Sequence, residues 1–166
     1  FFTFNLIDTI SQFLFREVYR FRPLIISGGF DLVLSKPINA LFRSLMGGAD
    51  LIDLLTIVPL MVATFYIGSL LNPSTVGTFY YLLLLINGLI IASAFHIFIL
   101  GLGIISLEID HTIMIYRDLF NLGRFPIDIY KEPLRGIITF LIPIGVMVTL
   151  PAKAIMGLIS PIVVIW

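Results

Sequence analysis

The sequence contains no cysteine and little charge. Only 12% of its 166 residues are Asp, Glu, Lys or Arg, whereas 59% are hydrophobic, and the mean hydropathy is +1.10. Without cysteine the chain can form no disulfide, no thiolate metal site and no cysteine nucleophile. Its ten basic and ten acidic residues cancel, so we expect no nucleic-acid partner. Because so apolar a composition lies outside the range of soluble globular domains, we predict a membrane protein.

Motifs of nucleotide and ester chemistry are also missing. The chain has no Gly-Lys pair, hence no phosphate-binding loop of the type G-x-x-x-x-G-K-[ST], and no G-x-S-x-G nucleophile elbow. Its histidines and carboxylates are not clustered at metal-ligand spacing. We therefore expect no metal, no cofactor and no catalytic residue. Any nucleotide chemistry must come from another polypeptide.

What the chain has instead is a very long uncharged stretch, with no Asp, Glu, Lys or Arg from Leu54 to Leu107. Hydrocarbon offers the backbone no hydrogen-bond partner, so spanning segments are helices or closed barrels, and long runs without alternation favour helices. Residues 51–71 predict one crossing of about 31 Å and residues 77–107 a second of about 46 Å, at roughly 1.5 Å per residue. The predicted fold class is all-α, a polytopic transmembrane helical bundle.

The basic residues orient this bundle. Half of the ten fall between residues 16 and 43, and none falls in the polar turn 72–76. By the positive-inside rule, residues 16–43 are predicted to be cytoplasmic and the turn to face the other side of the membrane. The chain is then expected to return to the cytoplasm near Glu108, Asp110 and His111.

Two later segments allow alternatives. Residues 112–126 predict either an amphipathic surface helix or a short crossing buried in protein, since Ile113 and Phe120 share an apolar face. Residues 134–157 either span the membrane or enter it and return as a re-entrant hairpin, because Pro143 removes a backbone donor within the apolar run.

Two pairs of ionisable residues are candidates for chemistry in the membrane. Asp50 or Asp53, together with His96 or His111, would suit a membrane-embedded enzyme. The structural interpretation is stronger. Asp50 is an acceptable N-cap, Asp53 lies in the first helical turn, and His96 suits a hydrogen bond inside the bundle. The enzyme is the rival hypothesis, and a purely structural membrane assembly subunit is a third.

The most distinctive segment is 21–45. Pro23 and the pair Gly28-Gly29 interrupt it, and from Phe30 onward its apolar positions predict short amphipathic helices with a bend at Pro37. A generic helix beside the membrane surface explains the same pattern without any function.

This segment carries a family resemblance. The order Gly-Gly-Phe-Asp-Leu-Val-Leu-Ser-Lys-Pro at 28–37, followed by an apolar helix and by Asp-Leu-Ile-Asp at 50–53, resembles the permease subunits of the ABC-2 family of transporters. The resemblance continues in Gly-Arg-Phe-Pro-Ile-Asp-Ile-Tyr at 123–130, in Ile-Pro at 142–143 and in Leu-Pro-Ala at 150–152.

The resemblance implies a six-crossing permease of an ATP-driven exporter in the plasma (inner) membrane. Such a permease pairs with a second permease subunit and docks on a separate nucleotide-binding ATPase subunit. On that map, residues 1–15 end the second crossing, 51–71 and 77–107 are the third and fourth, 112–126 is a short fifth, 134–157 is re-entrant, and the sixth starts at 160. The first crossing and most of the last have no counterpart, so we expect the chain to be truncated at both ends.

The resemblance also assigns a coupling helix within a cytoplasmic region at residues 16–50. Its implied contacts with the ATPase come from an entry turn, two charged side chains and an apolar face, namely Gly28, Gly29, Phe30, Asp31, Leu32, Leu34, Lys36 and Pro37. Displacement of this element by the ATPase would be carried into the bundle by rigid helices.

Overall fold

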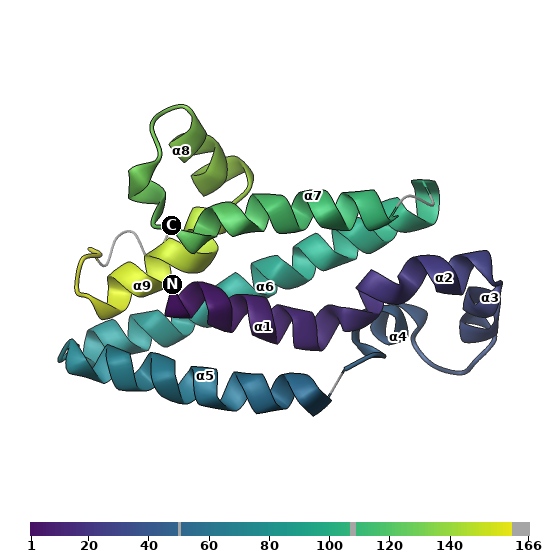
Figure 1. Cartoon of the computed structure of the whole chain (residues 1–166), viewed down its shortest axis with the longest axis horizontal. Coiled ribbons are helices and arrows are strands. Elements are labelled where there is room, and N and C mark those ends of the chain that lie inside the picture. The colour runs from purple at the N-terminus through teal and green to yellow at the C-terminus, as the bar shows by residue number, and fades with distance from the viewer. Residues whose placement is uncertain (50, 107–108, 161–166) are drawn as a thin grey trace.

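The architecture is a bundle of helices with a short-helix region at each end. The computed structural model describes residues 1–49, 51–106 and 109–160. These residues are mostly helical and contain no strand, which confirms the predicted all-α class. Four helices run side by side along the long axis (Figure 1): α1 (Phe2–Phe15), α5 (Leu51–Leu70), α6 (Thr75–Ser106) and α7 (Ile109–Asn121).

Helices α5 and α6 are each long and apolar enough to cross a membrane. Their bounds lie close to the apolar segments 51–71 and 77–107 expected from the sequence. The turn between them is formed by Asn72, which has a positive φ of 47°, and by Ser74, whose Oγ accepts a hydrogen bond of 3.0 Å from the Gly77 N–H. A polar turn is needed here because the first N–H groups of α6 have no partner within the helix.

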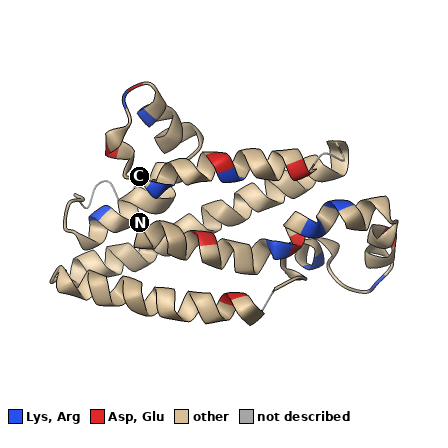
Figure 2. Ribbon diagram, in the orientation of Figure 1, with Lys and Arg blue, Asp and Glu red and all other residues tan. Residues whose placement is uncertain are grey.

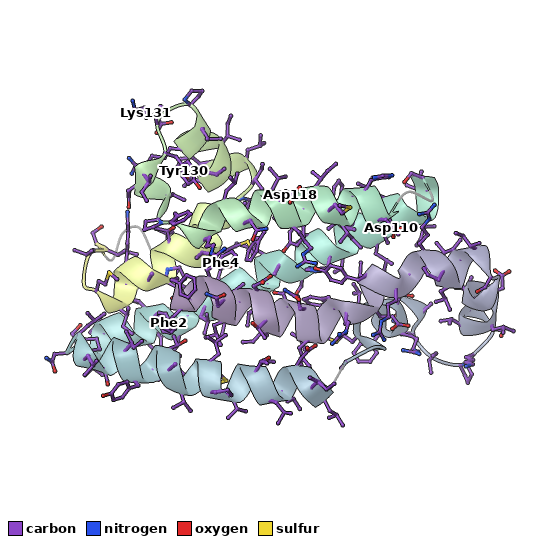
Figure 3. The ribbon with its side chains drawn as sticks, viewed as in Figure 1. Phe2, Phe4, Asp110, Asp118, Tyr130 and Lys131 are labelled. Carbon is purple, nitrogen blue, oxygen red and sulfur yellow. The ribbon has the colours of Figure 1, made fainter. Side chains whose placement is uncertain are left out.

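Two hydrophobic clusters hold the bundle together. One joins α1, α6 and α7 to the C-terminal segment and contains Phe4, Leu6, Ile7, Tyr81, Leu85, Ala92, Phe120, Ile144, Met147 and Val148. Within it the rings of Phe4 and Phe120 stack with centroids 5.0 Å apart, and Figure 3 shows where Phe4 lies. The other cluster lies toward the opposite end and contains Phe15, Val18, Phe21, Leu45, Ile99, Leu100, Ile109 and Ile113.

One end of the bundle carries a series of short helices, on the right in Figure 1. A 3-10 turn (Arg16–Arg20) leads from α1 into α2 (Phe21–Ile26), α3 (Gly29–Leu34) and α4 (Ala40–Met46). Pro37 lies in the loop between α3 and α4, and the side chain of Asn39 caps α4 by accepting a hydrogen bond of 3.0 Å from the Phe42 N–H. The expected pair of short helices around Pro37 is therefore present.

The other end is formed by the C-terminal segment. After α7 and short 3-10 turns, α8 (Leu134–Gly136) continues into a π-helical turn (Ile137–Leu141), and a second π-helical turn (Gly145–Thr149) leads into α9 (Leu150–Ile155). The two arms, Leu134–Leu141 and Gly145–Ile155, are bent by 78° at a short break containing Pro143. Proline cannot continue the helical hydrogen-bond ladder, which explains the break.

Helix α7 buries the apolar face expected from its sequence, with Ile113 and Phe120 buried and Arg117 and Asp118 exposed. It is shorter than the two spanning helices. Two expectations fall outside the described residues: the N-cap at Asp50 and the sixth crossing after Ser160. Of the residues near which the chain was expected to return to the cytoplasm, Glu108 lies outside the described part, whereas Asp110 and His111 lie in α7.

Candidate functional site

The residues expected to form a coupling element fold into α3 and the turn that precedes it. Gly28 has a φ of +71°, a left-handed conformation that glycine adopts at no steric cost, and α3 begins at the next residue. The ring of Phe30 meets that of Phe21 edge-on, with centroids 5.0 Å apart, and Val33 is buried. One face of α3 is thus fixed to the bundle.

The remaining residues of α3 and its loop face outward. Leu32 is 66% exposed and Leu34 is 56% exposed. Asp31, Lys36 and Pro37 are exposed as well. The side chains named from the sequence therefore divide into two groups: Phe30 anchors the helix, and the other side chains are free to meet a partner.

Helix α4 and the loop before it add exposed apolar side chains that were not named as site residues. Phe42 is 64% exposed, and Leu41 and Ile38 are 49% and 47% exposed. Leu45 on the same helix is buried in the second cluster. The sequence carries no clear signal for this exposure, because Leu41, Phe42 and Leu45 fall within an arc of about 100° and could share one buried face. We call the exposed residues Leu32, Leu34, Ile38, Leu41 and Phe42 the α3–α4 apolar residues.

Ion pairs tie these short helices to the long ones. Arg22 on α2 forms an ion pair of 2.7 Å with Asp110 on α7, and Arg43 on α4 lies 3.8 Å from Glu17 in the 3-10 turn. Figure 3 shows Asp110 at the end of α7 that adjoins α2. Together with Phe21 and Leu45 in the second cluster, these contacts connect the region physically to α1, α6 and α7.

The candidate catalytic residues have structural partners. Asp53, in the first turn of α5, forms an ion pair of 2.8 Å with Arg16. His96 is 1% exposed; its Nδ1 lies 2.8 Å from the Ala92 carbonyl oxygen and its Nε2 lies 3.3 Å from the Tyr19 hydroxyl. A carbonyl oxygen only accepts, so Nδ1 carries a proton, and in the neutral ring Nε2 accepts from Tyr19. The expected hydrogen-bonding role of His96 inside the bundle is confirmed.

No metal site is visible in the described part of the chain, where no three His, Asp or Glu side chains come together. His111 is exposed on α7, and Asp50 lies outside the described residues.

A polar cavity of about 240 Å³ lies between the N-terminal segment, α5 and α7. Its lining residues are Gln12, Arg16, Tyr19, Arg20, Asp53 and Arg117. This cavity was not among the sites expected from the sequence, although a signal for it was present. Asp8, Gln12 and Arg16 follow one another at intervals of four, which places three polar side chains on one side of α1 and of the turn that continues it.

A group of charged residues lies at the end of the bundle formed by the C-terminal segment. The carboxylate of Asp128 accepts from Lys153 on α9 at 2.6 Å and from Arg135 on α8 at 2.9 Å. The hydrogen bond from Lys153 lowers the pKa of Asp128 below its ordinary value, aided by the charges of Lys153 and Arg135. One carboxylate therefore joins the two arms of the bent C-terminal segment.

The charged residues are unevenly distributed along the bundle. Figure 2 shows long uncharged stretches on α5 and α6, whereas basic and acidic residues lie on the short helices, on α7 and on the C-terminal segment. The long apolar helices, the absence of strands among the described residues and this charge distribution define a helical transmembrane protein.

The family model for ABC-2 family transporter proteins matches residues 1–166. The chain thus belongs to the ABC-2 family, as its resemblance indicated, and is a membrane-spanning permease subunit of an ABC transporter. No curated protein and no solved structure shows significant similarity to it.

Proposed function

We propose that this permease subunit uses α3 and α4 to receive mechanical work from a separate ATPase subunit and thereby drives export across the plasma membrane. The observation that carries the proposal is the exposure of Leu32 and Leu34 beside the exposed charges Asp31 and Lys36. A surface facing lipid hydrocarbon would not hold these charges, whereas a protein groove accepts both apolar and charged side chains.

The proposed transmission route follows the contacts of the region. A push on α3 reaches α2 through the packing of Phe30 on Phe21, and reaches α7 through the ion pair between Arg22 and Asp110. Packed interiors are stiff, so such a displacement moves whole helices. A second permease subunit would complete the pathway, and the wide apolar exposure of α5 and α6 supports packing against such a partner or against lipid.

We also propose a topology in which α2–α4 are cytoplasmic and 134–157 is re-entrant on the other side. The excess of basic residues in 16–43 supports the first part. Two observations support a re-entrant segment: the 78° bend, and the contact of both Arg135 and Lys153 with the carboxylate of Asp128. Because these two residues belong to different arms, the start of the first arm and the end of the second lie at the same end of the bundle.

The test of coupling uses the full-length protein expressed with its ATPase. Asp31→Ala with Lys36→Ala should weaken ATPase retention on affinity purification about tenfold or more, since each charge-assisted contact is worth on the order of 1.5–3 kcal/mol. Leu32→Ser with Leu34→Ser should do the same by removing the apolar contact. Expression and membrane insertion should be unchanged, because these side chains lie outside the two clusters.

The matched control is Lys131→Ala with Glu132→Ala, which removes one base and one acid from exposed positions at the opposite end. It should retain the ATPase. If both double variants at α3 kept wild-type ATPase binding and transport, α3 would not be the coupling element. A protein whose function is purely structural assembly would show no dependence on ATPase at all.

A further inference from the structure

Among the described residues, the lining of the cavity that contains Arg16, Arg20 and Arg117 carries more positive than negative charge. Arg16 is paired with Asp53 at 2.8 Å. Arg20 and Arg117 form no ion pair within the described part of the chain. Among the described lining residues there are therefore three guanidinium groups and a single carboxylate.

The neighbouring acid on α1 only partly offsets this excess. Asp8 lies close enough to Arg117 for the two charges to interact, and it accepts a hydrogen bond of 2.9 Å from Gln12. It does not itself line the cavity. Counting Asp8 as ionised still leaves the described groups with one net positive charge.

The position of the cavity leaves its arginines open to a ligand. Arg117 is exposed on α7, which packs along the spanning helix α6. An arginine beside a spanning helix is favoured where it meets water, an acid or an anionic ligand. The other lining arginines, Arg16 and Arg20, belong to the 3-10 turn at the end of the bundle that carries α2–α4. In the proposed topology this end lies at the cytoplasmic surface, the level at which lipid headgroups meet a spanning protein.

The chemistry of the lining favours phosphate. Guanidinium groups present paired N–H donors that match phosphate oxygens, and several of them around one cavity can share a single anion. The volume of about 240 Å³ is several times the roughly 30 Å³ that a water molecule occupies in the liquid, so a phosphate group fits.

We propose that this cavity is a binding site for a phosphate group, carried either by an anionic phospholipid headgroup or by a soluble phosphate ester. Arg20 and Arg117 contact the phosphate directly, and Asp53 holds Arg16 in place beside it. The site goes beyond the coupling function, because it involves no residue of α3 or α4.

The test measures binding of short-chain phosphatidylglycerol to the full-length protein in detergent by native mass spectrometry. Wild-type protein should bind it saturably. Arg20→Gln and Arg117→Gln should each weaken binding about tenfold, the loss expected for one charge-assisted hydrogen bond. Arg117→Lys keeps the charge without the paired donors and should lose less. The matched control is Arg22→Gln, which removes the same charge from the same end but lies outside the cavity and should bind like wild type.

A second arm identifies the source of the phosphate. Glycerol 3-phosphate that displaces phosphatidylglycerol at equal concentration supports a soluble ester, and failure to displace it supports a lipid headgroup. The proposal is overturned if neither probe binds saturably, if Arg20→Gln and Arg117→Gln bind like wild type, or if Arg22→Gln loses as much. Should Arg117→Gln fail to fold, the exposed Arg20→Gln and the conservative Arg117→Lys decide the question by the same criteria.

Discussion

The two ends of the bundle are built differently. At the end formed by the C-terminal segment, backbones approach closely: a Cβ at Gly77 or Gly88 of α6 would lie only 3.0 Å and 2.9 Å from the carbonyl oxygens of Ala154 and Met147. At the other end, α2–α4 are held by aromatic packing and by ion pairs such as Arg22 with Asp110. There a Cβ at Gly103 of α6 would press on the side chain of Ile109 and not on backbone, and one at Gly101 would meet nothing within 4 Å.

The exposed apolar residues differ in their surroundings as well. Phe140 and Leu141, which are 84% and 75% exposed at the C-terminal end, belong to a run without charge from Gly136 to Ala152. Leu32 and Leu34 lie between Asp31 and Lys36 in the sequence. Apolar exposure in an uncharged run suits hydrocarbon, whereas apolar exposure among charges suits a protein partner. The closely packed end is suited to stay rigid while the α2–α4 end receives a partner.

The largest expected effect is in thiol labelling, which should show that the two ends of the bundle lie on opposite sides of the membrane. In this cysteine-free chain, Ser74→Cys should be modified completely by a membrane-impermeant thiol reagent applied from outside, and Ser35→Cys should not react. Both serines are exposed, so accessibility within the protein does not limit the reaction. Labelling is measured on intact cells, with permeabilised cells as the control. Reaction of Ser35→Cys from outside would reverse the orientation and remove the proposed coupling role.

A second labelling experiment tests the bent C-terminal segment. Leu134→Cys and Met156→Cys replace residues that are 43% and 53% exposed, and they leave the ion pairs of Asp128 intact. Both should react from the same side as Ser74→Cys if the segment is re-entrant. Reaction from opposite sides would mean that the segment spans the membrane despite its 78° bend.

The difference in packing can be measured with one matched pair of substitutions in α6. Gly88→Ala should destabilise the full-length protein by about 1–3 kcal/mol, because its Cβ would press on the Met147 carbonyl, which is backbone and cannot rotate away. Gly101→Ala should be neutral or stabilising by up to about 1 kcal/mol, since alanine favours helix and the space is open. Thermal unfolding in detergent checks both, and equal effects would contradict the proposed contrast between the ends.

The smallest effect concerns pH at Asp128. Its pKa is lowered in the folded protein, so its contribution to stability is present above the unfolded value near 3.8 and is lost as the pH falls through the lower folded value. The carboxylate is 42% exposed, so the contribution should not exceed about 1 kcal/mol. Asp128→Asn should therefore unfold slightly earlier than wild type at pH 7, and the two melting curves should approach each other as the pH falls below 3.8. A difference that stays constant with pH would show that the ion pairs contribute nothing.

Much of the candidate site was accessible from the sequence because it depends on local rules. Gly28 before a short apolar run predicted the turn that opens α3, and the structure has that turn with a positive φ. The outward direction of Phe42 was not predicted, because which face of a seven-residue helix is buried depends on where Leu45 finds its cluster. The polar cavity was not predicted either, because Arg117 comes close to the polar face of α1 only when α7 packs in the folded bundle.

The sequence by itself determined the class of protein and its spanning helices. An uncharged run from Leu54 to Leu107 must satisfy its backbone hydrogen bonds internally in hydrocarbon, and helices do so locally, within each turn. Only the tertiary structure decided which charges meet. Arg22 and Asp110 are 88 residues apart, and Arg16 and Asp53 are 37 apart, yet each pair lies within 2.8 Å. Helix formation is fixed by neighbours along the chain, whereas these pairings follow from how α1, α5 and α7 pack, which no local pattern specifies.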